Sequence, residues 1–363
     1  MKIFKSTFLF FISFNFVQAQ FTDVTKEAGI DNIYDVYQGL FGGGVVAFDY
    51  NNDGFEDLYI TAGQSQDVLY KNNGDGTFTD VIKESGLFKD RIIVTTGVSS
   101  ADVNKDGYID LLITTIASED NKTKKKKTLS PNLLFLNNGD GTFTDVGSKF
   151  GLTKNNFSTS SSFGDINADG YPDLFIGNYF KNFYFEDSPF GTHNIALLNH
   201  YSINEEYETG DDELYLNVDG KYFEDVSDLL IDAGKGYGFG GVFTDFDNDN
   251  DLDLFIINDF GETSESNRLM VNQYPELRFE NKSRELKINF GLKSMGVGVG
   301  DYNNDTFLDY HVTNIFAGPF IVNRGDGLPF VNLMNNVGTG VNKIKSFKDY
   351  ESVIIGWGSL FVD

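Results

Sequence analysis

Apolar and polar residues alternate over short stretches along most of the chain, and segments rich in Gly, Asn and Asp separate these stretches. Val45–Phe48 and Leu58–Ile60 are two such stretches, and an aspartate-rich loop lies between them. Alternation with a period of two is typical of half-buried β-strands. The pattern therefore predicts an all-β protein built from short strands.

A second element follows most of the acidic loops and consists of two apolar arms joined by Asn-Gly and Asp-Gly. It occurs at residues 69–81, recurs almost unchanged at 134–146, and appears in a looser form at 214–226. Such dipeptides favour tight hairpin turns, because those turns need positive φ. With one strand before each loop and one after it, each repeat has four antiparallel strands. This is the composition of a β-propeller blade.

The acidic loops follow the pattern Asp-x-Asn/Asp-x-Asp-x-x-x-Asp in five copies, which begin at residues 49, 102, 165, 245 and 301. Calcium prefers six to eight oxygen ligands and tolerates irregular geometry. Side chains at positions 1, 3, 5 and 9 of the loop, with the backbone carbonyl at position 7, would supply such a set. Glycine at position 6 of the first three loops permits a sharp turn. The pattern therefore predicts calcium as the cofactor.

The predicted calcium ligands are five residues from each loop, with the residue at position 7 contributing its carbonyl oxygen. They are Asp49, Asn51, Asp53, Phe55, Asp57, Asp102, Asn104, Asp106, Tyr108, Asp110, Asp165, Asn167, Asp169, Tyr171, Asp173, Asp245, Asp247, Asp249, Asp251, Asp253, Asp301, Asn303, Asp305, Phe307 and Asp309. No catalytic residue is predicted.

Two other interpretations of these loops are weaker. An EF-hand would need a glutamate at position 12 and flanking helices, but position 12 is isoleucine or valine in all five copies. Asp/Asn-rich turns without a metal would not need to keep the same ligand positions five times. The fifth loop has the β-branched Thr306 at position 6, where positive φ is wanted, so we expect it to bind weakly or to be distorted.

Composition narrows the class of partner. The chain has 363 residues, a formal net charge of −26 and no cysteine. A nucleic-acid-binding surface would need the opposite charge, so nucleic acid is excluded as a partner. The absence of cysteine rules out disulfides and thiolate metal sites.

The first 19 residues have the features of a signal peptide. Lys2 and Lys5 precede a short phenylalanine-rich stretch, and Ala19 ends a sequence similar to a cleavage site. The mature chain would then begin at Gln20 and would be exported to the periplasm, the outer cell surface or the medium. No transmembrane segment is predicted, because no apolar run approaches the roughly 18 residues needed to cross a bilayer.

Together, these motifs resemble the FG-GAP/VCBS repeats of integrin-α-like β-propellers, over residues 21–363. Phe41-Gly42 and Phe239-Gly240 are similar to the element that gives the repeat its name. Phe21–Val24, the hairpins and Gly356-Trp357-Gly358 resemble an exported bacterial branch that often ends in an ASPIC/UnbV domain. The resemblance implies a seven-bladed propeller with calcium at loop positions 1, 3, 5, 7 and 9.

Five repeats are predicted to be complete, and Asp363 would be the first ligand of a sixth. Residues 20–363 are therefore interpreted as a propeller domain truncated at the start of its sixth repeat. Phe21–Val24 resembles the outer arm of a hairpin, and we expect it to be a strand that could close the ring. The glycines at 42–44 and 238–241 are expected where backbones approach closely near the propeller axis.

The leading functional hypothesis is an exported, calcium-binding scaffold for adhesion to a protein or carbohydrate partner at the cell surface. A polysaccharide-active, lyase-like enzyme is the alternative, and a purely structural module is a third possibility. The sequence has no H-E-x-x-H or G-x-S-x-G motif. An aromatic-rich insertion at residues 178–213 could stack on sugars or contact a protein, although an extra hairpin with its own small core would also explain it.

Overall fold

The structure is a computed structural model that describes residues 22–35, 42–87, 92–119, 129–181, 208–232, 234–315, 317–325, 327–337, 344–347, 350–352 and 359. The predicted signal peptide, Phe21, Trp357 and Asp363 lie outside the described residues, as does most of the aromatic-rich insertion. No helix in these ranges is long and apolar enough to cross a membrane.

Five antiparallel sheets of four strands each make up the fold, and in every sheet the strands follow chain order. The first sheet contains β1 (Val45–Phe48), β2 (Asp57–Ile60), β3 (Val68–Asn72) and β4 (Phe78–Asp80). The second contains β5 (Ile92–Ala101), β6 (Asp110–Glu119), β7 (Leu133–Asn137) and β8 (Phe143–Asp145). The third contains β9 (Phe157–Gly164), β10 (Asp173–Phe180), β11 (Glu213–Val218) and β12 (Tyr222–Asp225).

The fourth sheet contains β13 (Tyr237–Thr244), β14 (Asp253–Asp259), β15 (Arg268–Asn272) and β16 (Phe279–Asn281). The fifth contains β17 (Val297–Gly300), β18 (Asp309–Val312), β19 (Phe320–Val322) and β20 (Val331–Asn332). The remaining elements are short: η2 (Ser227–Leu229), α1 (Met334–Val337), and the pair β21 (Ile344–Phe347) and β22 (Tyr350–Ser352).

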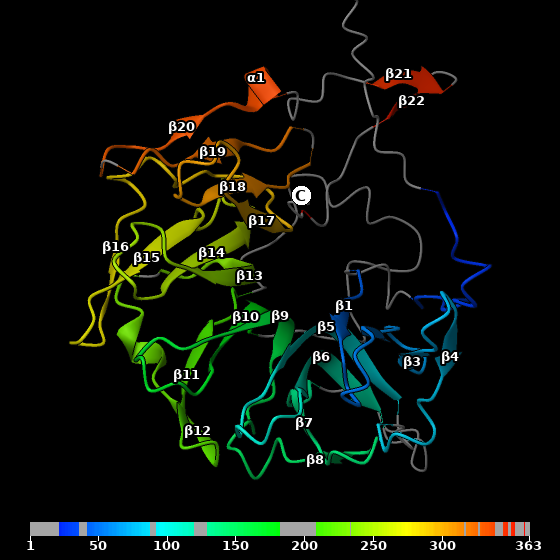
Figure 1. Ribbon diagram of the computed structural model, residues 1–363. Coiled ribbons are helices and arrows are strands. Elements are labelled where there is room, and N and C mark those ends of the chain that lie inside the picture. Colours follow the sequence, from blue (N-terminus) through cyan, green and yellow to red (C-terminus); the bar gives the residue numbers. More distant parts are fainter. Residues whose placement is uncertain are drawn as a thin grey trace, which may run out of the picture.

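The five sheets follow one another around an arc (Figure 1). The first strand of each sheet lies on the inner side, where β9 contacts both β5 and β13. Within the described residues the arc does not close into a ring. The structure thus confirms the predicted all-β fold of four-stranded antiparallel sheets in a β-propeller-like arrangement.

The core lies between neighbouring sheets, and the alternation of side chains explains how. On β6, Leu111 packs in the cluster shared with the first sheet, whereas the next residue, Leu112, packs in the cluster shared with the third sheet. On β14, Leu254 and Phe255 divide in the same way between the third and fifth sheets. The second, third and fourth sheets therefore bury their two faces against two different neighbours, and every sheet shares its core with at least one other.

Glycines on the inner strands allow the backbones to approach closely. A Cβ atom on Gly44 would lie 2.8 Å from the backbone nitrogen of Val98, and one on Gly97 would lie 2.8 Å from the carbonyl oxygen of Thr159. Both contacts join neighbouring repeats. The expected close approach is confirmed for Gly44 and for Gly238, where a Cβ atom would lie 2.9 Å from the carbonyl oxygen of Asn178, but not for Gly42, which has open space around it.

The segment before the first sheet differs from the prediction. Residues 22–24 form no strand, and residues 25–29 form a turn instead. This turn still packs on the first sheet, because the N–H of Phe78 donates to the carbonyl oxygen of Ala28 at 2.8 Å. An equivalent bond joins the first two repeats: the N–H of Phe143 in the second sheet donates to the carbonyl oxygen of Ser85, which lies in the turn after the first sheet. The segment therefore corresponds to the end of a repeat, and its contact is made by the turn rather than by a strand.

A buried side chain just before the third strand ties that strand to the end of the second. In the first repeat Asp67 accepts hydrogen bonds from Ala62 N and Thr95 Oγ1, both at 2.7 Å, and from Tyr59 Oη at 2.8 Å. Asn132 and Asn267 accept the corresponding backbone hydrogen bond in the second and fourth repeats. Burial raises the pKa of Asp67 to about 6, since a charge is costly away from water.

Replacing Asp67 with asparagine should therefore stabilise the protein at neutral pH. The folded-state pKa lies above the unfolded value of about 3.9, so ionisation of the carboxylate opposes folding; this penalty is complete above about pH 6 and shrinks as the pH falls toward about 4. We expect Asp67→Asn to raise the free energy of unfolding by about 1–3 kcal/mol at pH 7.5. Urea denaturation in EDTA at pH 7.5 and pH 5 would measure this gain. A gain that did not shrink at the lower pH would contradict the explanation.

Candidate functional site

The five acidic loops join the first strand of each sheet to the second, and their side chains fold back on the loop backbone. In the first loop Asp49 Oδ1 accepts a hydrogen bond from Asp53 N at 3.0 Å, and Asp49 Oδ2 accepts one from Gly54 N at 2.7 Å. Asn51 Oδ1 also accepts from Asp53 N, and Asp53 Oδ1 accepts from Phe55 N. These bonds turn the oxygen atoms of positions 1, 3 and 5 toward the inside of the loop.

The two bonds to the position-1 aspartate recur in the other four loops. Their acceptors are Asp102, Asp165, Asp245 and Asp301, and every distance lies between 2.7 and 3.1 Å. The sequence pattern therefore has one geometry, repeated five times.

Two positions in each loop have left-handed backbone conformations. The sequence predicts this for position 6, where φ is 88° at Gly54 and 77° at Thr306. Position 4 was missed, although φ is 58° at Lys105 and 56° at Ala168. Thr306 carries the expected strain, but the expected distortion is wrong, because the hydrogen bonds of the fifth loop match those of the others.

The aspartate at position 9 is the first residue of the second strand in every sheet. This confirms that the chain continues as a strand where an EF-hand would form a helix. The side chains of Asp57, Asp110, Asp173, Asp253 and Asp309 all have 0% exposure. In the second repeat Asp110 Oδ2 accepts a hydrogen bond from Val103 N at 2.9 Å, and Asp110 Oδ1 accepts one from Asn137 N at 2.8 Å.

Burial makes these position-9 carboxylates hard to ionise. It raises the pKa of Asp110 and Asp173 to about 7 and that of Asp253 to about 8, and neighbouring loop carboxylates add to the effect. The pKa values of Asp57 and Asp309 are also raised, again mainly by burial. A bound cation would favour the ionised form of all five.

The fourth loop has the densest charge. One carboxylate oxygen from each of Asp245, Asp247 and Asp253 lies within 4.8 Å of the others. Asp251 Oδ1 is buried and has no hydrogen-bond partner among the described residues. Burial and the neighbouring Asp249 raise the pKa of Asp251 to about 6. The converging oxygens of Asp245, Asp247 and Asp253 fit a divalent cation with oxygen ligands.

At position 7 the side chains of three loops pack against the hairpin turn of the same repeat. A Cβ atom on Gly74 would lie 2.7 Å from the ring of Phe55, and one on Gly139 would lie 2.6 Å from that of Tyr108. The ring of Phe307 lies over Gly325 in the same way. This contact gives each of these turn glycines a second role besides its positive φ.

Sequence reasoning missed a buried asparagine that joins each loop to the loop of the preceding repeat. Asn137, which is 2% exposed, donates from Nδ2 to the carbonyl oxygen of Tyr50 in the first loop at 2.7 Å. It also donates to Ile109 O in its own loop at 3.2 Å. The other such asparagines are Asn217, Asn272 and Asn323, which donate to Val103 O, Ile166 O and Phe246 O of the preceding loops.

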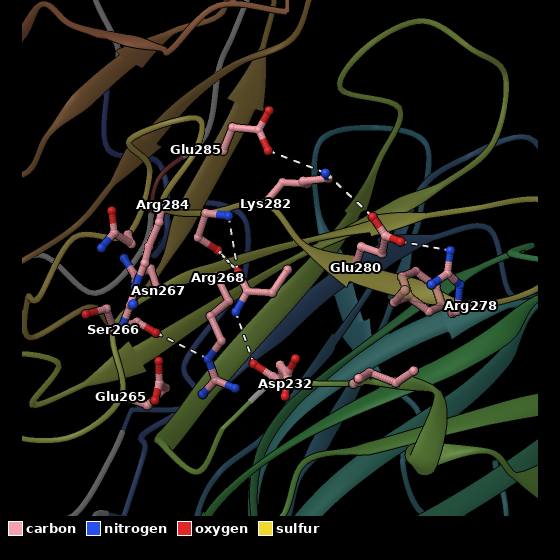
Figure 2. A pocket seen from close by; sticks show the side chains of 15 residues that line it. Asp232, Glu265, Ser266, Asn267, Arg268, Arg278, Glu280, Lys282, Arg284 and Glu285 are labelled. Atoms are coloured by element: carbon pink, nitrogen blue, oxygen red, sulfur yellow. Dashed lines mark hydrogen bonds and ion pairs between the residues drawn. The ribbon is translucent and has the colours of Figure 1, made fainter.

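A separate pocket of about 620 Å³ lies beside β15 and β16, against the turn that follows η2 (Figure 2). Charged side chains pair across it: Arg278 and Lys282 both contact Glu280, at 2.8 and 3.5 Å. Arg268 lines its wall and is 1% exposed, and its Nη2 atom is buried without a hydrogen-bond partner among the described residues. The pocket offers charge of both signs to a polar ligand.

Comparisons with known proteins point to one repeat family. The family model described as FG-GAP-like repeat matches residues 35–113, 116–176 and 245–312. Cartilage acidic protein 1 of Xenopus tropicalis is 26% identical over 239 residues, which are 65% of this chain and 30% of that protein. The human protein of that name is 27% identical over 207 residues, 54% of this chain and 26% of its own length. The chain thus spans less than a third of these curated relatives.

Two solved structures are similar at low identity. A lectin from Agrocybe aegerita, described as recognising non-reducing terminal N-acetylglucosamine, aligns with a TM-score of 0.46 and 17% identity, over 81% of this chain and 66% of the lectin. The biofilm matrix protein Bap1 of V. cholerae aligns with a TM-score of 0.39 and 14% identity, over 81% of this chain and 40% of that protein.

The asparagine bridge gives a stability prediction. Asn137→Ala would leave the carbonyl oxygens of Tyr50 and Ile109 without this donor in a buried region, so we expect a loss of about 2–3 kcal/mol in the free energy of unfolding. Asn138→Ala is the matched control, because the neighbouring Asn138 is exposed and its side-chain amide bonds only to Thr142 Oγ1 and Thr144 Oγ1 within the same hairpin. Chemical denaturation of both variants would test this. Equal losses of unfolding free energy in the two variants would contradict a stabilising role for the bridge made by Asn137.

Proposed function

Because the chain belongs to the FG-GAP-like repeat family, we propose that it is a calcium-stabilised, extracellular scaffold that binds a protein or carbohydrate partner. The observation that carries the proposal is the fourth loop, where three carboxylates converge and a buried oxygen of Asp251 has no donor among the described residues. Ionised carboxylates this close repel one another, and a cation between them would remove that repulsion.

Calcium suits these loops better than magnesium, since it accepts more oxygen ligands at longer and less regular distances. The side chains at positions 1, 3, 5 and 9 would hold it, together with the carbonyl oxygen at position 7. Bound calcium would neutralise the carboxylates. Its main effect here would be structural, because the loops join the strands on which each sheet depends.

The wider assembly is also part of the proposal. We place the chain in the exported ASPIC/UnbV-associated branch, with a seven-bladed ring and a signal peptide at residues 1–19. The similarity to cartilage acidic protein 1 supports a location outside the cell. For the partner we favour the pocket beside β15 and β16, because it combines a buried guanidinium, Arg268, with exposed charged groups at its edge.

Calcium should raise the thermal stability of the protein. At a free concentration 100 times Kd, each site that binds only the folded state adds about 2.7 kcal/mol. We expect a higher melting temperature in calcium than in EDTA, and a smaller gain in equimolar magnesium. An unchanged melting temperature would contradict the metal assignment.

The fourth loop offers a matched pair of variants for counting sites. Both Asp247→Ala and Asp247→Asn remove one negative charge, but only asparagine keeps an oxygen at position 3, as in the other four loops. Isothermal titration should show one calcium ion fewer for the alanine variant and an unchanged number for the asparagine variant. Loss of a site in both would mean that charge, not ligand geometry, decides binding.

Partner binding can be tested by screening the protein on glycan and protein arrays with product analysis. Retention of a ligand in calcium and its loss in EDTA are expected, and Arg284→Ala at the pocket edge should weaken retention several-fold. Lys83→Ala, on an exposed turn of the first repeat, is the control for loss of positive charge. Released oligosaccharides would favour the lyase-like alternative over a scaffold.

A further inference from the structure

The buried asparagines place neighbouring loops in one hydrogen-bonded chain. Asn137 donates from its side chain to Tyr50 O of the first loop, and its backbone N–H donates to Asp110 of the second loop. Asn137 therefore contacts Tyr50, which follows the first predicted ligand of the first loop, and Asp110, which is the last predicted ligand of the second loop. Both of its contacts are buried.

The same arrangement joins the other neighbouring loops. Asn217 lies between the second and third loops, because it donates to Val103 O and, through its backbone, to Asp173. Asn272 does the same for the third and fourth loops, and Asn323 for the fourth and fifth. All four junctions between the five loops thus contain one such residue.

A second contact links some loops directly at the surface. Asn52, at position 4 of the first loop, donates to Gly107 O at position 6 of the second loop at 3.2 Å. Asn248 makes the equivalent bond from the fourth loop to Thr306 O of the fifth at 3.1 Å. Each donor lies next to a side-chain ligand in its own loop, so a change in one loop reaches the backbone of the next.

From this geometry we propose that Asn137, Asn217, Asn272 and Asn323 are positioning residues that couple calcium binding between neighbouring loops. The proposal rests on the proposed function, since it requires that the loops bind calcium. Calcium binding in one loop fixes the backbone at position 2, as at Tyr50 in the first loop. The asparagine bonded to that carbonyl oxygen, here Asn137, then holds the position-9 aspartate of the next loop, Asp110, in its ligating position. Neighbouring loops therefore bind calcium with positive cooperativity, and distant loops do not.

Hydrogen–deuterium exchange with mass spectrometry, performed across a calcium titration, resolves the loops individually. The midpoint of protection is measured for peptides that cover residues 102–110 in the second loop and 245–253 in the fourth. Asp49→Ala removes the first ligand of the first loop and should raise the midpoint of the second loop about fivefold. The midpoint of the fourth loop should stay unchanged, which also shows that the variant is folded.

Asn137→Ala is the second variant, because it removes no calcium ligand. It should raise the midpoint of the second loop relative to that of the fourth, and Asn137→Gln, which keeps an amide donor, should restore part of the affinity. A role in stability alone would lower the melting temperature and leave the ratio of the two midpoints as in the wild type. That result would overturn the proposal.

The two levels of the proposal fail differently. If calcium protects each loop but Asp49→Ala leaves the midpoint of the second loop unchanged, the sites are independent and the coupling is wrong. If calcium protects no loop at all, the proposed function is wrong and the coupling falls with it.

Discussion

Two hydrogen bonds to one buried carboxylate hold each repeat together. The position-9 aspartate accepts from the backbone of its own loop and from the end of the third strand, as Asp173 does from Ile166 N and Asn217 N. Without the carboxylate, two backbone donors would be left in an apolar region. With it, a charge is buried there, and this is why its pKa rises to about 7. A cation in the loop would offset the cost of burying the charge and would leave both backbone hydrogen bonds to the carboxylate in place.

The repeats depend on one another because they share these contacts and their cores. Leu111 and Leu112 face different neighbours although they are adjacent in the chain. The asparagine of each repeat bonds to the loop of the preceding one, as Asn272 does to Ile166 O. A sheet removed from the array would lose apolar partners on both faces and a hydrogen-bond donor for its loop. Stability in such an array comes from interfaces between repeats as much as from the repeats themselves.

Much of the fold could be predicted because its determinants are local in sequence. Alternating residues predict the strands, the Asn-Gly turns predict the hairpins, and the aliphatic residue at position 12 excludes an EF-hand, for example Ile60. The asparagine bridges could not be predicted, because Asn137 and Tyr50 lie 87 residues apart. The positive φ at Lys105 was also missed, since lysine does not favour that conformation. Residues 22–24 repeat the sequence of an outer strand but have no strand structure, because pairing depends on a neighbour that sequence similarity does not reveal.

The five loops share one backbone geometry but differ in charge, and this difference determines how a row of such sites would behave. Asp53 in the first loop has Lys71 Nζ at 3.3 Å, which offsets part of the negative charge there. The fourth loop has an aspartate at every odd position, and the fifth has the strained Thr306. More ligand charge favours calcium, whereas strain that is released when the loop opens opposes it. The loops that we expect to bind calcium most and least tightly are therefore neighbours, joined by Asn323 and by the contact of Asn248 with Thr306. At that junction, hydrogen bonding between loops would have its largest effect, because an ion in the fourth loop would order the backbone of the fifth.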